Sequence, residues 1–182
     1  MLRHACHLAL IAALAAPCLA RAADCKDRKP TTWDIVVGPA SEPGERLEVT
    51  GHVRSTMDNR PLAGITVYVY HADARGEYNP DQRQPPRLCG ILRTNASGAY
   101  RIRTSMPGGY GGFPGHIHFE VWGPRVTRQH LFVNLVPAKD DSARGTAPAP
   151  RGYLNATDRP VYRGADGIHR MEKDLLVTLT AR

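Results

Sequence analysis

The sequence predicts an all-β fold, an antiparallel β-sandwich with long irregular loops and little helix. Short segments rich in Val, Ile, Thr and Tyr recur along the chain, and Gly, Pro, Asn and Asp separate them. After the first 22 residues, no segment keeps a helical period for more than two turns. Many short strands joined by turn signals are typical of a sandwich.

Residues 1–22 have the pattern of a signal peptide. A short basic start precedes an apolar run from Leu8 to Ala16, and Ala20-Arg-Ala22 fits a small-x-small cleavage site. The run is too short to span a bilayer, so we expect no membrane segment in the mature form. A lipoprotein site at Cys18 is the alternative. We expect residues 23–182 to be exported, to the periplasm or outside the cell, and to form a single domain.

Six segments have strand character. The segment from Leu47 to Val53 alternates apolar and polar residues, and the segment from Ile65 to Tyr70 is rich in β-branched and aromatic residues. A tight turn, Asn95-Ala-Ser-Gly98, precedes the third. The expected strands are 47–53, 65–70, 99–104, 116–122, 129–136 and 174–180.

Loops rich in Gly and Pro lie between these segments. Residues 26–46 are expected to be an extended lead-in to the first strand. Residues 73–90 form a loop of a length that usually carries function in a compact domain. Residues 138–170 are irregular, and we expect them to cover a rim or an edge of the sandwich.

Two cysteines remain after the signal peptide. Cys25 and Cys89 are an even pair in an oxidising compartment, which predicts one disulfide. Thiolate metal ligation is the poorer alternative, because the chain has no Cys-x-x-Cys spacing.

The charge pattern argues against nucleic acid as a partner. Without the signal peptide, 22 basic residues face 17 acidic ones, a net charge of about +5. The basic residues are scattered, whereas a protein that follows a phosphate backbone clusters them on one face. The sequence leaves the oligomeric state open, a homo-oligomer included.

A His-x-His pair marks the candidate site. His116 and His118 lie on an expected strand, so both imidazoles share one face, roughly 7 Å apart at the backbone. Two tyrosines, Tyr78 and Tyr110, each end a Gly-containing loop segment before this strand. Phenolate is a hard anionic donor, so this set suits a trivalent iron ion. A solvated histidine pair is the alternative.

These residues resemble the motifs of the intradiol ring-cleavage dioxygenases, non-haem iron(III) enzymes of the catechol and protocatechuate dioxygenase type. The resemblance covers roughly residues 40–136. The phrase Tyr70-His-Ala-Asp-Ala-Arg-Gly-Glu-Tyr78 looks most like the exported branch of the family. The further motifs are Arg93-Thr-Asn-Ala-Ser-Gly-Ala-Tyr-Arg-Ile-Arg-Thr104, Pro107-Gly-Gly-Tyr110 and Gly115-His-Ile-His-Phe119.

The resemblance implies a role for individual residues. Tyr78 and His116 match the equatorial iron ligands of the family. Tyr110 and His118 match the axial ligands, and Tyr110 is the one that leaves when substrate binds. Gln129 lies where the family usually has a glutamine beside the ligands, so Tyr110 and Gln129 are the implied catalytic residues.

The implied substrates are a small aromatic diol and O2, with Fe(3+) as cofactor. The ring would be cleaved between its two hydroxyl-bearing carbons to give a muconate-type diacid. The family commonly has an arginine three residues before the first histidine, whereas this chain has Phe113. Arg101, Arg103 and Arg125 are candidate replacements, and the departure leaves the choice of catechol open.

Two other interpretations remain. Residues 51–100 also fit a non-catalytic, transthyretin-like β-sandwich that serves as a binding module, which would not need the two phenols and two imidazoles. Phe113 also fits a homologue that binds iron but has lost turnover.

Overall fold

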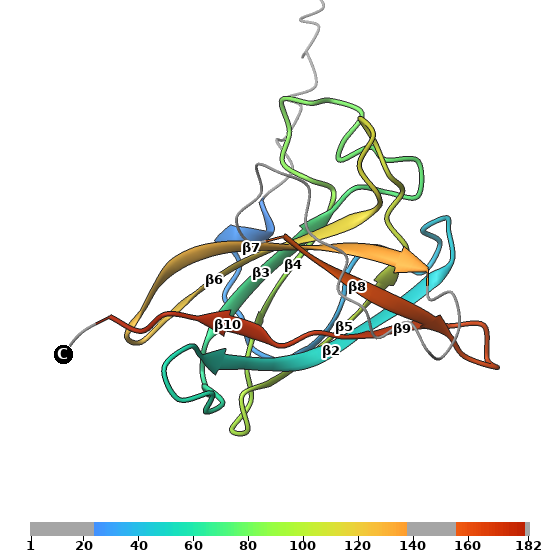
Figure 1. Cartoon of the computed structure of the whole chain (residues 1–182). Helices are drawn as coiled ribbons and strands as arrows, with labels where there is room; N and C mark the ends of the chain where they lie inside the picture. The colour runs from blue at the N-terminus through green and yellow to red at the C-terminus, as the bar shows by residue number, and fades with distance from the viewer. Residues whose placement is uncertain (1–23, 138–155, 181–182) are drawn as a thin grey trace, which may run out of the picture.

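The computed structural model describes residues 24–137 and 156–180, and nearly all its elements are strands (Figure 1). The expected signal peptide, residues 1–22, lies outside the described residues. Within the described part, no helix is long and apolar enough to cross a membrane. The elements are η1 Cys25–Asp27, β1 Asp34–Val36, β2 Arg46–Ser55, β3 Thr66–His71, β4 Leu88–Arg93, β5 Ala99–Ser105, β6 His116–Gly123, β7 Val126–Pro137, β8 Ala156–Arg163, β9 His169–Glu172 and β10 Leu175–Val177.

The strands form two layers that β8 joins. One layer has the order β4-β3-β6-β7-β8, and the other has the order β8-β9-β2-β5-β1. β9 and β10 follow one another along the same edge of β2. Figure 1 shows β7, β6, β3 and β4 above β2, β5 and β10, with β8 crossing between the layers. The predicted β-sandwich is therefore confirmed.

The sheet is mixed rather than purely antiparallel. The pairs β2–β5, β3–β4, β3–β6, β6–β7 and β8–β9 are antiparallel as expected. The pairs β1–β5, β2–β9, β2–β10 and β7–β8 are parallel. Parallel neighbours need a crossover connection, which no local turn signal reveals.

Alternation along the strands builds the core between the layers. β2 buries Leu47, Val49 and Val53 on its inner face. On β6, Ile117 and Phe119 point into the same core, and both are fully buried. Because successive strand residues alternate, the even-numbered residues of β6 lie on the outer face of that layer.

Four strands lie where the sequence predicted loops or irregular chain. β1 lies within the expected lead-in, and β4 begins at Leu88, inside the expected loop 73–90. β8 lies within residues 138–170, and β9 begins at the end of that range, at His169; residues 138–155 lie outside the described part. β8 contains Pro160 and several charged residues, a composition that argues against a strand unless a neighbouring strand pairs with it.

One disulfide ties the N-terminal segment to the sandwich. The structure joins Cys25 to Cys89, the pair that the sequence predicted. The bond fixes η1 against β4. Residues 24–27 are thereby held next to the sheet that carries the histidine pair.

Candidate functional site

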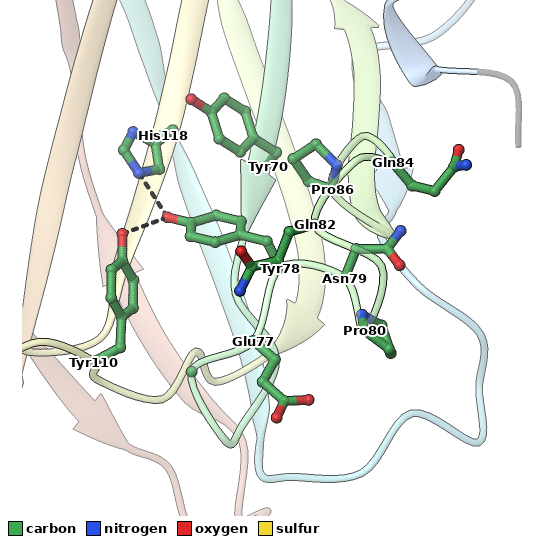
Figure 2. A pocket seen from close by; sticks show the side chains of 11 residues that line it. Tyr70, Glu77, Tyr78, Asn79, Pro80, Gln82, Gln84, Pro86, Tyr110 and His118 are labelled. Atoms are coloured by element: carbon green, nitrogen blue, oxygen red, sulfur yellow. Dashed lines mark hydrogen bonds between the residues drawn. The ribbon is translucent and has the colours of Figure 1, made fainter.

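Two phenols and two imidazoles converge at the start of β6. Figure 2 shows three of these side chains, Tyr78, Tyr110 and His118. Tyr78 Oη lies 2.8 Å from His118 Nε2 and 3.3 Å from His116 Nε2. Tyr110 Oη lies 3.1 Å from Tyr78 Oη and 3.2 Å from His116 Nε2. These four residues are named the donor cluster below. All four predicted ligands therefore meet at one place.

The sheet places the two histidines of the cluster. His116 pairs with Asn134 of β7, and His118 lies between Phe132 of β7 and Tyr70 of β3. The Tyr70 and His118 rings are stacked, with centroids 4.6 Å apart and planes 6° from parallel. Strand pairing, on both sides of His118 and with β7 at His116, fixes the direction of the two imidazoles.

A turn shaped by Asp73 places Tyr78. The Asp73 side chain accepts hydrogen bonds from the backbone N–H of Arg75, at 2.9 Å, and of Glu77, at 3.0 Å. This Asx-type turn lets the chain reverse just after β3. Gly76 has φ +86° within the turn, a conformation that favours glycine. Tyr78 follows directly, so its phenol points back toward β6.

The loop that carries Tyr110 packs against the same turn. The Gly108 N–H donates a 2.8 Å hydrogen bond to the Asp73 carbonyl. A Cβ on Gly76 would lie 2.6 Å from the Gly109 carbonyl oxygen, so the two loops touch backbone to backbone. Asp73 thus connects the positions of both phenols.

His116 directs Nε2 at the phenols with its proton on Nδ1, and burial keeps His118 neutral. His116 Nδ1 lies 2.9 Å from the Pro114 carbonyl, which can only accept, so Nδ1 carries the proton and Nε2 is free to accept. Burial, together with His116 and His130 nearby, lowers the pKa of His118 to about 3. His118 is therefore neutral near pH 7.

A third histidine, His130 of β7, joins the site. Its Nε2 lies 3.1 Å from His118 Nδ1 and 3.4 Å from Tyr70 Oη. Its ring is parallel to that of His118, with centroids 5.1 Å apart. A partner on Nδ1 fixes the orientation and tautomer of an imidazole ligand.

Gln129 lies away from the donor cluster, and the catalytic role implied for it stays a prediction. Its strand position faces Val121, on the side of the sheet opposite the histidines. Its Nε2 donates to the Thr178 carbonyl at 3.0 Å, and its Oε1 accepts from the Thr178 N–H at 3.2 Å. Phe132 occupies the place across from His118, with ring centroids 5.7 Å apart.

None of the three candidate arginines reaches the cluster. Arg101 and Arg103 both bind the Asp34 carboxylate on β1. Arg125 lies in the turn between β6 and β7, at the opposite end of β6 from His116. Phe113 closes the turn of the Tyr110 loop, where its N–H donates to the Tyr110 carbonyl at 2.9 Å.

A cavity of about 680 Å³ opens onto the cluster. Tyr70, Tyr110 and His118 form one wall, and the loop 76–86, which carries Tyr78, forms the other (Figure 2). This volume lies within the roughly 300–1,000 Å³ typical of small-molecule sites.

The spacing of the donor atoms fits a single metal ion. Two ligand atoms in neighbouring positions, each about 2.0–2.1 Å from an ion, lie roughly 3 Å apart. The four separations recorded in the cluster run from 2.8 to 3.3 Å. Among residues 24–137 and 156–180, His, Cys, Asp and Glu alone form no group of three or more suited to a metal. A metal at this place would therefore depend on the phenols.

Comparison with known proteins identifies the family. Residues 17–146 match a family model described as "Dioxygenase". Catechol 1,2-dioxygenase 2 of Acinetobacter lwoffii is 32% identical over 115 residues, which cover 52% of this chain and 42% of that protein. Chlorocatechol 1,2-dioxygenase of Pseudomonas sp. (strain P51) is 29% identical over 126 residues, covering 56% and 49%. The chain thus matches less than half the length of these relatives.

Solved structures share the fold. The dioxygenase domain of a dioxygenase and carbohydrate-binding protein fusion from Streptomyces sp. SirexAA-E superposes with TM-score 0.62 at 23% identity, covering 84% of this chain and 92% of that one. Catechol 1,2-dioxygenase from Pseudomonas arvilla C-1 gives TM-score 0.63 at 22% identity, covering 81% and 57%. At this level of identity the likeness concerns the fold.

Proposed function

This chain belongs to the intradiol ring-cleavage dioxygenase family, and we propose from that premise that its donor cluster holds one non-haem iron(III) ion. We further propose that it cleaves a catechol-type ring between the two hydroxyl-bearing carbons with O2, giving a muconate-type diacid. The observation that carries the proposal is the convergence of two phenol oxygens and two imidazole nitrogens within 2.8–3.3 Å of their neighbours.

The donor set suits iron(III) by its chemistry. Phenols ionise near pH 10 in water, so two of them bound as phenolates near neutral pH need a strong Lewis acid. When bound, iron(III) supplies Lewis acidity that withdraws electron density from the diol. The protein supplies the positions of the four donors and the walls of the cavity.

The two phenols differ in freedom, which assigns them different roles. Tyr110 is 39% exposed and lies on a loop at the mouth of the cavity, whereas Tyr78 is half-buried. Tyr78 contacts Tyr110 and both imidazoles, whereas Tyr110 contacts Tyr78 and one imidazole, His116. We therefore assign Tyr110 Oη to accept a proton from a substrate hydroxyl as that hydroxyl takes its place, while Tyr78 stays.

Metal analysis and oxygen uptake test the proposal together. The purified protein should contain one iron per chain and absorb visible light, because tyrosinate bound to iron(III) is coloured. Catechol should be consumed with one O2 per ring. His118→Ala should lose iron and colour, whereas the matched control His52→Ala, on β2, should keep both. Protein that takes up no iron even after reconstitution would refute the proposal.

A homologue that binds iron but has lost turnover is the second candidate. It is favoured by Phe113, which stands in the place of the usual arginine, and by the distance of Arg101, Arg103 and Arg125 from the cluster. Such a protein would be coloured and would bind catechol without consuming O2. The non-catalytic, transthyretin-like binding module would be colourless.

Export is proposed as well. Residues 1–22 have the signal-peptide pattern, and the Cys25–Cys89 disulfide suits an oxidising compartment. N-terminal sequencing of protein from the periplasm or the medium should begin near residue 23. An intact N-terminus on protein from the cytoplasm alone would contradict export.

A further inference from the structure

The cavity at the donor cluster continues beyond Tyr70. A second hollow of about 370 Å³ shares three of its walls, Tyr70, Gln84 and Pro86, with the first. In Figure 2, Tyr70 lies between His118 and Pro86, and Gln84 lies farther along the same loop. The two hollows therefore form one groove, with a near end at the donor cluster and a distal end at Asp24, Lys26 and Arg83.

The groove is longer than a single aromatic ring requires. The near end alone, at about 680 Å³, has the volume of a site for a drug-sized ligand. Its walls combine Tyr70, Pro80 and Pro86 with the amides of Gln82 and Gln84. Such a surface suits an aromatic ring that carries a further substituent.

The two ends of the groove differ in charge. Among the described residues that line the near end, the one charged side chain is Glu77, and none is a cation. The distal end has Lys26 and Arg83 against the single carboxylate of Asp24. An anionic group would be repelled at the near end and attracted at the distal end.

Arg83 is the cation that the distal end offers to a ligand. Lys26 is engaged, because its ammonium binds Glu120 and lies 4.7 Å from the centroid of the Tyr68 ring. Within residues 24–137 and 156–180, no ion pair joins Arg83 to a carboxylate, and its side chain is exposed. An arginine presents a planar fork that matches a carboxylate.

The distal end is held in place by covalent and polar contacts. The Cys25–Cys89 disulfide fixes η1 to β4. Asp24 accepts hydrogen bonds from the Lys26 N–H at 3.1 Å and from Tyr68 Oη at 3.3 Å. These contacts keep the end of the groove open beside the sheet.

We propose that the preferred substrate is a catechol whose ring carries a short carbon chain ending in a carboxylate. The diol would lie at the donor cluster, the chain would pass Tyr70, and the carboxylate would lie at Arg83. A carboxylate attached directly to the ring would instead stay at the near end, beside Glu77. This inference rests on the proposed dioxygenase function and names its substrate class.

Oxygen uptake with a matched set of diols tests the inference. The set is catechol, protocatechuate, dihydrocaffeate and the methyl ester of dihydrocaffeate. The acid and the ester differ in charge and share the ring and the chain. An exposed ion pair is worth up to about 1 kcal/mol, so the KM of the acid should be about three- to fivefold below that of the ester. Protocatechuate should have the highest KM.

Two arginine variants locate the effect. Arg83→Gln should abolish the difference between the acid and the ester. Arg125→Gln removes the same charge at the far end of β6 and should keep the difference. Anaerobic titration of the visible band should give Kd values with the same pattern, which separates binding from turnover.

The outcomes distinguish the two proposals. Turnover of catechol with equal KM for acid and ester would overturn the substrate class and leave the dioxygenase function standing. An equal effect of Arg83→Gln and Arg125→Gln on the ratio would also overturn it. Absence of both binding and turnover for all four diols would overturn both proposals.

Discussion

Replacing Arg87 with glutamine tests whether buried charge holds the loop that carries Tyr78. The Arg87 guanidinium donates hydrogen bonds of 2.6 and 2.8 Å to the Glu42 carboxylate and one of 2.8 Å to Asp73. Both carboxylates are 4% exposed. Glutamine would leave two buried carboxylates facing each other without a cation. Because Asp73 shapes the turn before Tyr78, the loss should also loosen the donor cluster.

The cost follows from the burial of the three groups. Removing one partner of a buried ion pair costs about 3–5 kcal/mol. The Arg87 side chain is 32% exposed, so water screens part of the interaction and we expect the lower end, about 3 kcal/mol. With a urea m-value of about 2 kcal/mol/M, the unfolding midpoint should fall by roughly 1.5 M.

The stability that Arg87 contributes should depend on pH. The hydrogen bond from Arg87 holds the pKa of Glu42 below its usual value. Burial alone would raise the pKa of Asp73, but the N–H of Glu77 and the Arg87 guanidinium hold it low. Lowered carboxylate pKa values stabilise the fold above the unfolded pKa of about 4, and this contribution is lost as the pH falls through the folded values. The stability difference between wild type and Arg87→Gln should therefore be largest near neutral pH and shrink below about pH 4.

Urea unfolding at neutral and acidic pH, followed by tryptophan fluorescence, measures both effects. The matched control is Arg101→Gln, which removes a doubly bonded arginine from Asp34 at the surface, with side chains 38% and 18% exposed. Exposed pairs contribute about 1 kcal/mol or less. Equal losses in the two variants, or a loss independent of pH, would refute the reasoning.

Three further changes have expected outcomes. Replacing Cys25 and Cys89 by alanine opens a loop with a sequence separation of 64, which should lower the free energy of unfolding by about 4 kcal/mol in urea titration; a loss under 1 kcal/mol would argue against the disulfide in solution. Gln129→Ala should keep kcat with catechol within about twofold and cost about 1 kcal/mol of stability, since its amide bonds the backbone of Thr178 and Thr127 and none of the donor cluster; a large loss of kcat with iron retained would instead support its catalytic role. His130→Phe keeps a ring beside His118 and removes the nitrogen partner, so chelator competition should show about tenfold weaker iron binding, and unchanged affinity would refute the contact.

The sequence could predict what local patterns determine. The alternation in β2 and β6 separates core residues from outer ones, so the shared face of His116 and His118 followed from their spacing. Both tyrosines were found because each lies in a motif beside a Gly-containing turn. By contrast, β1, β8 and β9 depend on partners far away in sequence, such as β5, β7 and β2, and their own residues resemble loops.

The contacts between the loops that carry Tyr78 and Tyr110 could not be predicted from the sequence either. Asp73 looks like an ordinary turn residue, because an Asx turn needs only a local side chain. Its link to Gly108 joins segments 35 residues apart and exists because β3 and β6 are neighbours in the sheet. Its ion pair with Arg87 likewise forms only when the loop 73–87 closes.

A register shift in the β6–β7 hairpin places His130, rather than Gln129, on the face of the sheet that carries the histidine pair. At the turn, Gly123 pairs with Val126. Continued without a shift, that register would set His118 opposite Leu131 and place Gln129 on the histidine face. The irregularity between Val121 and Gly123 moves the pairing by one residue, and a shift of one residue turns every side chain of a strand to the other face. His130 therefore reaches His118 and Gln129 lies on the other face, a placement that the residues of the turn alone do not determine.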